Sequence, residues 1–250
     1  MKAPRPLRGV WRLARAVLHG LRGLAIVLLL FPRLDRSARQ GHIRRWSATM
    51  FGRMGMTLQL VGTFKPGSKL IVANHVSWLD ILAVHAACPE ARFVSKADVR
   101  EWPLVSRLVD AGETLYIERE RKRDAMRVVH QTAEALARGD TVAVFPEGTT
   151  GPGPVLLPFH ANLLQAAIAA EVAVQPVVLR YADRHGAFSP DAEFLGETTL
   201  AQSLWKLACA DAMTVHVMAL SPVGARHADR RALAAALRES IDAELAPFRR

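Results

Sequence analysis

The fold of this chain is decided by the stretch Leu70-Ile71-Val72-Ala73-Asn74-His75-Val76-Ser77-Trp78-Leu79-Asp80. Its first four residues form an apolar run of β type, as expected for a strand that is buried on both faces of a parallel sheet. The polar residues that follow predict a loop that opens into a helix over 77–87, with Ser77 as the cap of that helix. In α/β proteins, ligands bind beyond the carboxyl ends of such strands. The stretch therefore predicts an α/β fold with a functional site after residue 73.

Short apolar runs alternate with helical patterns along the rest of the chain. Further strands are predicted at 58–61, 92–95, 114–118, 141–145, 172–179 and 214–220. Helices are predicted at 100–110, 120–138, 160–170 and 228–245, whereas 183–200 is expected to form a long loop. Strands separated by helices of this length predict a mixed, largely parallel sheet flanked by helices. We expect one α/β domain over residues 57–250.

The basic charge of the chain is concentrated at its N-terminus. The net charge at pH 7 is +10, and residues 1–45 alone contain eleven Lys or Arg against one acidic residue, Asp35. The apolar run Leu24–Phe31 lies among these arginines and ends at Pro32. A nucleic-acid-binding arm has no use for such a run, whereas a cationic helix in the headgroup region of a membrane does. Residues 1–56 are therefore predicted to be two membrane-associating helices that contact an anionic membrane surface, and nucleic acid is not an expected partner.

The same region bears on where the protein resides. The uninterrupted apolar run is shorter than the roughly 20 residues that span a bilayer, so we expect peripheral or monotopic attachment. Whether residues 17–31 cross the membrane or only enter it stays open. Arginines continue after the run, which argues against a secretory signal. Cys88 and Cys209 have no metal-ligand spacing and are expected to be reduced core thiols, which favours the cytoplasmic face of the inner membrane.

His75 and Asp80 are the first candidates for catalysis. If residues 77–87 are helical, Asp80 lies about one turn into the helix, and the loop that carries His75 can fold back toward it. An imidazole held by a carboxylate has one nitrogen fixed as a donor and the other free to accept a proton. A His and an Asp at this spacing are common by chance, however, so the pair needs support from elsewhere in the chain.

A second motif, Phe145-Pro146-Glu147-Gly148-Thr149-Thr150, also follows a predicted strand. Its turn leaves backbone N–H groups and a threonine hydroxyl able to meet a phosphate or a polar headgroup, although an ordinary strand-ending turn is the alternative. The chain has no Gly-x-Ser-x-Gly elbow, so no activated nucleophile is evident. A metal site is not expected, because no second histidine lies at ligand spacing; His85 is expected to pack or to face solvent.

These two motifs, in this order and some 70 residues apart, resemble those of the glycerolipid acyltransferases of the 1-acylglycerol-3-phosphate acyltransferase type. Two further blocks are similar to that family, Gly112–Arg119 (Gly-Glu-Thr-Leu-Tyr-Ile-Glu-Arg) and the proline-containing 174–178 (Val-Gln-Pro-Val-Val). Order and spacing agree across all four blocks, and the resemblance covers roughly residues 55–220.

Three positions depart from the pattern of the family. Tyr116 and Glu118 replace the usual phenylalanine and aspartate, which are mild changes. Thr150 stands where many members have an arginine, and this removes one possible cation for the headgroup. The departure at Thr150 bears on which acceptor the enzyme would use.

The resemblance implies transfer of a fatty acyl group from acyl-CoA or acyl carrier protein to the sn-2 hydroxyl of lysophosphatidate, giving phosphatidate without a cofactor. His75 would be the base, and Asp80 would orient it and stabilise its cationic form. Arg119 is expected to bind phosphate, because its planar fork suits that group. The other residues predicted in the substrate site are Asn74, Lys96, Glu147, Gly148 and Thr149.

Three alternatives stay open at this point. The same chemistry on another lysolipid, such as lyso-ornithine lipid, is favoured by Thr150. A lipid hydrolase or thioesterase would use the same base to activate water. A non-catalytic membrane-binding protein is the third, and the intact set of His75, Asp80, Arg119 and Glu147 argues against it.

Overall fold

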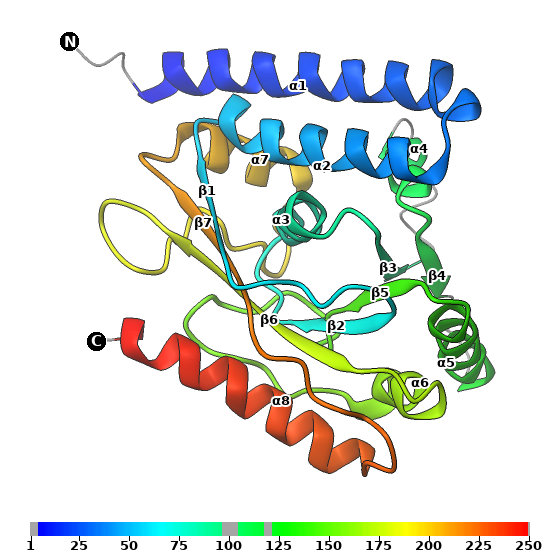
Figure 1. Ribbon diagram of the computed structural model, residues 1–250. Helices are drawn as coiled ribbons and strands as arrows, with labels where there is room; N and C mark the ends of the chain where they lie inside the picture. Colours follow the sequence, from blue (N-terminus) through cyan, green and yellow to red (C-terminus); the bar gives the residue numbers. More distant parts are fainter. Residues whose placement is uncertain (1–4, 97–104, 118–121, 250) are drawn as a thin grey trace.

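The structure is a computed structural model that describes residues 5–96, 105–117 and 122–249, and within these residues it shows one seven-stranded sheet with helices on both faces (Figure 1). The strands are β1 (Thr57–Val61), β2 (Lys69–Ala73), β3 (Ala91–Lys96), β4 (Leu115–Ile117), β5 (Thr141–Val144), β6 (Val174–Ala182) and β7 (Thr214–Ala219). Their order is β1-β7-β6-β2-β5-β3-β4. Neighbours are parallel except β6 and β7, so the predicted mixed, largely parallel sheet is confirmed.

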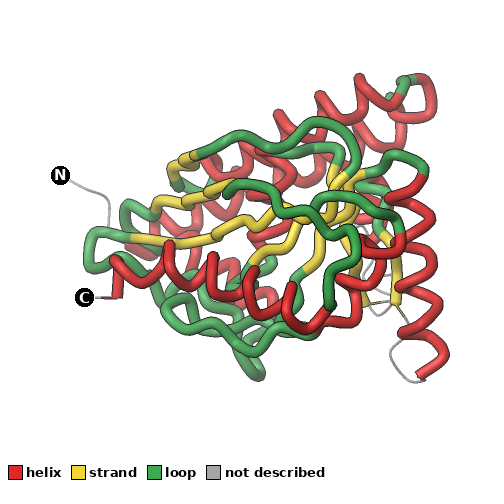
Figure 2. The backbone as a smooth tube through the Cα atoms, turned by 60° about the horizontal axis from the view of Figure 1, so that its bottom comes forward, coloured by secondary structure: helices red, strands yellow, loops and turns green. Residues whose placement is uncertain are grey.

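The helices occupy two layers, and the tube in Figure 2 shows the strands between them. They are α1 (Arg5–Leu29), α2 (Arg36–Arg53), α3 (Leu79–Ala87), α4 (Val105–Ala111), α5 (Lys122–Ala137), α6 (Leu164–Ala169), α7 (Leu200–Cys209) and α8 (Arg230–Leu245), with short 3-10 helices η1 (Phe31–Arg33), η3 (Ala161–Leu163) and η4 (Ala246–Arg249). In Figure 1, α1, α2, α3 and α7 lie on one side of the sheet, and α6 and α8 lie on the other. The sequence therefore predicted the elements well, apart from one helix.

Helix α7 is the element that the sequence analysis missed. The predicted loop 183–200 was correct up to its last residues, but no helix was expected after it. The start of α7 is marked by a capping box: the Thr199 hydroxyl accepts the N–H of Gln202, and the Gln202 side chain accepts the N–H of Thr199. This Thr-x-x-Gln pattern is a recognised start signal, so the helix was readable from the sequence.

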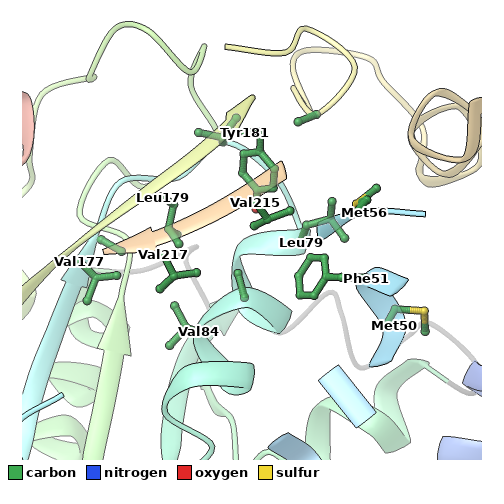
Figure 3. Packing of buried hydrophobic residues seen from close by; sticks show 14 of the residues in the cluster. Met50, Phe51, Met56, Leu79, Val84, Val177, Leu179, Tyr181, Val215 and Val217 are labelled. Carbon is green, nitrogen blue, oxygen red and sulfur yellow. The ribbon is translucent and has the colours of Figure 1, made fainter. Parts of the chain in front are cut away.

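The core lies on both faces of the sheet. One apolar cluster fills the space between the sheet and helices α2 and α3, and Figure 3 shows Phe51, Leu79, Leu179 and Val215 within it. A second cluster lies between the sheet and α5, α6 and α8. Strand β2 is buried along its whole length, so the loop that follows it begins at a well-packed strand end. Each large apolar side chain buried here contributes about 1.5–3 kcal/mol relative to exposure.

Helix α1 packs on α2 and α7 through small residues. A Cβ at Gly23 would collide with the Trp46 indole, and one at Gly9 would lie 2.5 Å from the Cys209 sulfur. The Trp46 Nε1–H donates to the His19 carbonyl at 3.0 Å, and the His19 and Trp46 rings stack. The close approach of these helices therefore depends on residues without a bulky side chain.

The outer face of α1 is apolar and exposed. Leu18 is 69% exposed and Trp11 is 59% exposed, and a shallow groove of about 500 Å³ on this face is lined by Val10, Leu13, Ala14, Val17, Leu18 and Leu21. Among the described residues, the helical segment Pro6–Arg33 is long and apolar enough to cross a membrane by length and composition. The predicted pair of N-terminal helices is present as α1 and α2, and the domain boundary after residue 56 stays an interpretation.

Two arginines of α1 contact the C-terminal end of α7 and do not face solvent. Arg12 donates to the carbonyls of Ala208 (3.2 Å) and Ala210 (2.6 Å) at the C-terminus of α7, and Arg8 pairs with Asp211 at 3.1 Å. Cations at a helix C-terminus meet unpaired carbonyls and the negative end of the helix dipole. These side chains therefore attach α1 to the C-terminal end of α7, a role that the count of N-terminal charges could not reveal.

Candidate active site

The predicted site lies at the carboxyl ends of β2 and β5. His75 is the second residue after β2, Asp80 is in the first turn of α3, and Glu147 is the third residue after β5. Strands β2 and β5 are parallel neighbours, so the loops that follow them emerge side by side. The sheet therefore brings together the two motifs that lie some 70 residues apart in the sequence.

His75 and Asp80 form a direct pair. The His75 Nδ1 lies 2.8 Å from Oδ2 of Asp80, and the Asp80 side chain is fully buried while that of His75 is 19% exposed. Because an ionised carboxylate can only accept, the proton of this bond belongs to Nδ1, and Nε2 is left as the proton acceptor. The predicted pairing of these two residues is therefore confirmed by the geometry.

Asp80 also organises the loop that carries His75. Its Oδ2 accepts the N–H groups of Val76 (2.7 Å) and Ser77 (2.9 Å), and its Oδ1 accepts the phenol O–H of Tyr181. The predicted capping by Ser77 is wrong. Helix α3 begins at Leu79, and Asp80 in its first turn accepts the N–H groups of Val76 and Ser77, which precede the helix. The buried Ser77 hydroxyl makes no hydrogen bond within the part of the chain that the structure describes.

The face of the His75 ring rests on an aromatic stack. The Phe145 ring lies parallel to it, with centroids 4.0 Å apart and an interplanar angle of 8°, and Phe93 stacks on Phe145 at 5.6 Å. The Phe145 face covers one side of the imidazole, so the stack limits rotation of the His75 ring. Phe145 belongs to the second motif, but its contact with the His75 ring depends on the neighbouring strands and was not predicted.

Glu147 supports His75 through the backbone. Its Oε1 accepts the His75 N–H at 2.7 Å, and its Oε2 accepts the Leu157 N–H at 2.8 Å. The residue is 4% exposed, and burial raises the pKa of its carboxyl, an effect that these two N–H donors oppose. The carboxylate thus joins the loops after β2 and β5, and its predicted contact with a headgroup stays a prediction.

Asn74 is engaged in a similar way. Its amide donates to the Leu179 carbonyl and accepts the Leu179 N–H, both at 2.8 Å, and the residue is 1% exposed. This pair extends the contact between β2 and β6 by one residue past the end of β2. Asn74 therefore fixes the start of the His75 loop, and a direct contact with substrate stays a prediction.

The other predicted substrate-binding residues lie around the turn after β5 or near β3 and β4. Gly148 has a φ of +72°, in the left-handed region that favours glycine, and Thr149 beside it is exposed. Lys96 ends β3, in register with Ile117, but its side chain lies outside the described residues. Arg119 also lies outside the described residues, so its predicted contact with phosphate stays a prediction.

Thr150 does not present its hydroxyl to the site. It donates to the carbonyl of Phe194, and the Phe194 N–H donates to the Val76 carbonyl at 3.1 Å. The loop that contains Phe194 is thereby attached to both motif loops. Where many family members are expected to carry an arginine, this chain has a threonine whose hydroxyl is hydrogen-bonded to the Phe194 carbonyl.

His85 and the cysteines are accounted for by packing. His85 is 8% exposed, its Nε2 lies 3.0 Å from the Ala91 carbonyl, and burial lowers its pKa to about 4. Both cysteines are free; burial raises the pKa of Cys88 to about 12, whereas Cys209 is half-buried. Within the described ranges, no three His, Cys, Asp or Glu residues gather in a way that could hold a metal ion.

Comparisons with known proteins place the chain among acyltransferases. A family model described as Acyltransferase matches residues 61–180. The lyso-ornithine lipid O-acyltransferase of Pseudomonas aeruginosa is 36% identical over 92% of this chain and 89% of that protein. The 1-acyl-sn-glycerol-3-phosphate acyltransferase of Neisseria meningitidis is 36% identical over 72% of this chain and 71% of that protein. The crystal structure of the 1-acyl-sn-glycerophosphate acyltransferase of Thermotoga maritima has the same fold, with a TM-score of 0.74, 19% identity and 98% coverage of both chains.

The comparisons thus define an acyl-transferring enzyme, and the His75–Asp80 pair lies within the residues that the family model matches. The chain belongs to the acyltransferase family that includes these bacterial lysolipid acyltransferases.

Proposed function

We propose that this enzyme transfers a fatty acyl group from a thioester donor to the sn-2 hydroxyl of lysophosphatidate, giving phosphatidate. The observation that carries this proposal is the 2.8 Å bond between His75 Nδ1 and Asp80 Oδ2, which leaves Nε2 as a base. The relative from Neisseria meningitidis is named for this reaction. The acceptor and the donor are both substrates, and the reaction needs no cofactor beyond the thioester itself.

The transfer proceeds by direct attack. His75 Nε2 takes the proton of the lysolipid hydroxyl as its oxygen attacks the thioester carbonyl, and the resulting oxyanion collapses to expel the thiolate. The imidazolium then gives its proton to the thiolate. Asp80 stays ionised and stabilises the imidazolium, and the Phe145 ring covers one side of the His75 ring. General base catalysis of this kind contributes about 10²–10⁴-fold.

Lyso-ornithine lipid is the second candidate acceptor. The lyso-ornithine lipid acyltransferase from Pseudomonas aeruginosa aligns over more of this chain than the Neisseria enzyme does. In addition, Thr150 supplies no cation for a phosphate, and its hydroxyl already donates to Phe194. The chemistry is unchanged for this acceptor, because a free hydroxyl is again the nucleophile.

The donor is acyl-CoA or acyl carrier protein, and the enzyme acts at the cytoplasmic face of the inner membrane through residues 1–56. The support for membrane attachment is the exposed apolar face of α1 together with the basic charge of this segment. An exposed apolar surface of this kind marks a membrane or protein contact. The lysolipid acceptor is itself a membrane component, so attachment places the site next to its substrate.

The function is tested with purified protein in detergent or vesicles. Labelled acyl-CoA or acyl carrier protein is supplied with either lysophosphatidate or lyso-ornithine lipid, and the lipid products are separated. Wild type is compared with His75→Ala, with His130→Ala as a matched control because His130 is exposed on α5. We expect diacyl product from wild type and His130→Ala, and a loss of about 10²–10⁴-fold in His75→Ala.

The outcomes separate the alternatives. Phosphatidate as the product supports the first acceptor, whereas product from lyso-ornithine lipid alone keeps the mechanism and replaces the acceptor. Free fatty acid released without acceptor indicates a hydrolase. Activity that does not depend on His75 contradicts the proposal as a whole.

Membrane attachment is tested by flotation with vesicles that contain anionic phospholipid. Leu18→Glu places a charge on the outer face of α1, and Met126→Glu, at a residue of α5 that is 60% exposed, is the matched control. A charge buried at the membrane is costly, so we expect Leu18→Glu to reduce binding severalfold and Met126→Glu to leave it unchanged. Equal binding by both variants would exclude the α1 face as the attachment surface.

A further inference from the structure

The mechanism above does not use Tyr181, although this residue is buried against the carboxylate that holds the base. Tyr181 is 2% exposed, and Figure 3 shows its ring near Val215 at the end of β6. Its phenol donates a hydrogen bond to Oδ1 of Asp80. A buried phenol on a buried carboxylate is a feature that calls for an explanation, because hydrogen bonds to charged groups are among the strong ones in proteins.

The position of Tyr181 results from the lengths of two neighbouring strands. Ala73, the last residue of β2, is in register with Val177, and β6 continues to Ala182. The overhanging part of β6 therefore lies beside the loop that carries His75. Side chains alternate along a strand, so Leu179 and Tyr181 face the same side as Val177, toward α3.

We propose that Tyr181 is a positioning residue for acyl transfer, which holds Oδ1 of Asp80 so that Oδ2 faces Nδ1 of His75. This inference rests on the proposed role of His75 as the base. The two oxygens of Asp80 have separate tasks: Oδ2 accepts from His75 and from two backbone N–H groups, whereas Oδ1 accepts from Tyr181. The torsion of a carboxylate is broad, so a donor on the second oxygen narrows the orientation of the whole group.

Tyr181 also takes a share of the negative charge on Asp80. A hydrogen bond to an ionised carboxylate stabilises its negative charge, so the phenol competes with His75 for the charge on Asp80. Without the phenol, Oδ2 still accepts the N–H groups of Val76 and Ser77 and stays beside Nδ1, although the carboxylate is held less firmly. More of its charge then acts on His75 and stabilises the imidazolium. A more stable imidazolium requires a higher pH before Nε2 can act as a base. The pH at which kcat rises on the acid side of its profile, the acid limb, therefore reports on the hydrogen bond between Tyr181 and Asp80.

The phenol acts only as a donor. Burial, together with the adjacent Asp80 carboxylate, raises the pKa of Tyr181 well above its usual value. The titratable groups that face Asp80 within the described residues are His75 from the loop after β2, Tyr181 from β6 and Glu147 from the loop after β5. Of these three groups, the phenol of Tyr181 can be removed without changing the formal charge of the site, because it is neutral.

The chain provides a matched control. It has two tyrosines, and the other one, Tyr116, also donates to an aspartate, with its hydroxyl 2.6 Å from Oδ1 of Asp110 at the surface. Tyr181→Phe and Tyr116→Phe therefore remove the same kind of hydrogen bond at two places. The variants are compared by kcat and KM across pH and by thermal unfolding, with His75→Ala as the reference for loss of the base.

For Tyr181→Phe we expect kcat to fall about tenfold, with KM for both substrates close to wild type. The acid limb of kcat moves to higher pH, whereas Tyr116→Phe shows neither effect. A merely structural role of Tyr181 would lower the unfolding temperature and leave the acid limb in place. An acid limb in Tyr181→Phe that coincides with that of Tyr116→Phe overturns the proposal.

A second measurement keeps the hydroxyl and the fold. In the Tyr116→Phe background, 3-fluorotyrosine supplied in the growth medium replaces Tyr181 alone. The fluorinated phenol is the stronger donor and withdraws more charge from Asp80, so the acid limb moves to lower pH, opposite to Tyr181→Phe. No movement, or movement in the same direction as Tyr181→Phe, overturns the proposal.

Failure of the proposed function and failure of the proposed role of Tyr181 give different experimental results. Activity in His75→Ala would contradict the proposed function, whatever Tyr181 does. An inactive His75→Ala together with a Tyr181→Phe variant that behaves like Tyr116→Phe would overturn only the role of Tyr181.

Discussion

Two buried aspartates lie at opposite ends of the parallel strands, and their surroundings differ. Asp80, beyond the carboxyl end of β2, accepts hydrogen bonds from two backbone N–H groups, a phenol and an imidazole. Asp140, just before β5, accepts from the guanidinium groups of Arg36 and Arg92, each at 2.6 Å. One carboxylate thus meets neutral donors and a histidine, and the other meets two permanent cations.

The two carboxylates are suited to different tasks because their partners differ in how they carry charge. An arginine is charged at every working pH, so the charge of Asp140 is compensated permanently, and the contact attaches α2 to the sheet. A histidine can gain and lose its proton near neutral pH. Under the proposed mechanism, the charge of Asp80 is therefore available to a partner that becomes cationic only during the reaction.

The largest expected effect comes from Asp80→Asn. The amide can still accept from the backbone, but it carries no negative charge to stabilise the imidazolium. We expect kcat to fall about 10³-fold while KM for the acceptor changes little. Asp140→Asn, measured in the same assay, is the matched control with kcat close to wild type. Equal losses of kcat in Asp80→Asn and Asp140→Asn would show that the different surroundings of the two carboxylates have no effect on catalysis.

Glu147→Gln is expected to have an intermediate effect. Both oxygens of Glu147 accept backbone N–H groups, and a glutamine has only one acceptor oxygen, so one buried N–H loses its partner. We expect kcat to fall about tenfold with an unchanged KM for the lysolipid. A rise in KM with an unchanged kcat would instead support the headgroup contact that the sequence predicted. Glu134→Gln, at an exposed position on α5, is the control.

The smallest effect on activity is expected for Asp140→Asn, whose cost falls on stability. Burial raises the pKa of Asp140, but the hydrogen bonds from Arg36 and Arg92 outweigh it, so the net pKa is lowered. Arg36 is half exposed, which weakens its share of the interaction. We expect a loss of about 2 kcal/mol and an unfolding temperature lower by about 5 °C at pH 7.

The pH dependence of this difference gives a further check on Asp140. A carboxyl with a lowered folded-state pKa stabilises the fold above its ordinary value of 3.8 and loses that contribution as the pH falls through the folded value. The gap between wild type and Asp140→Asn should therefore narrow below that value. Asp242→Asn, which breaks a surface pair with Arg249, should show a much smaller gap at any pH.

Much of the site could be predicted because its parts are local in sequence. The His75–Asp80 pair lies within one loop and one helical turn, and the second motif lies within six residues. Both follow apolar runs that predict buried strands, and that placement held in the structure. Helix α7 was not predicted although its capping box is present, because the box begins within the last residues of the predicted loop 183–200.

The roles of several residues could not be predicted, because they depend on partners from other elements. Glu147 was expected to shape a headgroup site, but its oxygens accept backbone N–H groups from two loops. Asn74 pairs with the backbone of Leu179, which is 105 residues away in the chain. Tyr181 was overlooked because the predicted strand ended at residue 179, although the alternation of Val177 and Leu179 continues to it.

Local patterns in the sequence specify which strands and helices follow one another along the chain, the basic apolar N-terminus and the chemical groups available at the site. These follow from periodicity and from interactions that span a few residues. The tertiary structure decided that β6 lies next to β2 and extends past it, and hence that Tyr181 meets an aspartate 101 residues away. Strand order depends on which faces of distant elements bury each other best, and no local pattern in the sequence encodes that choice.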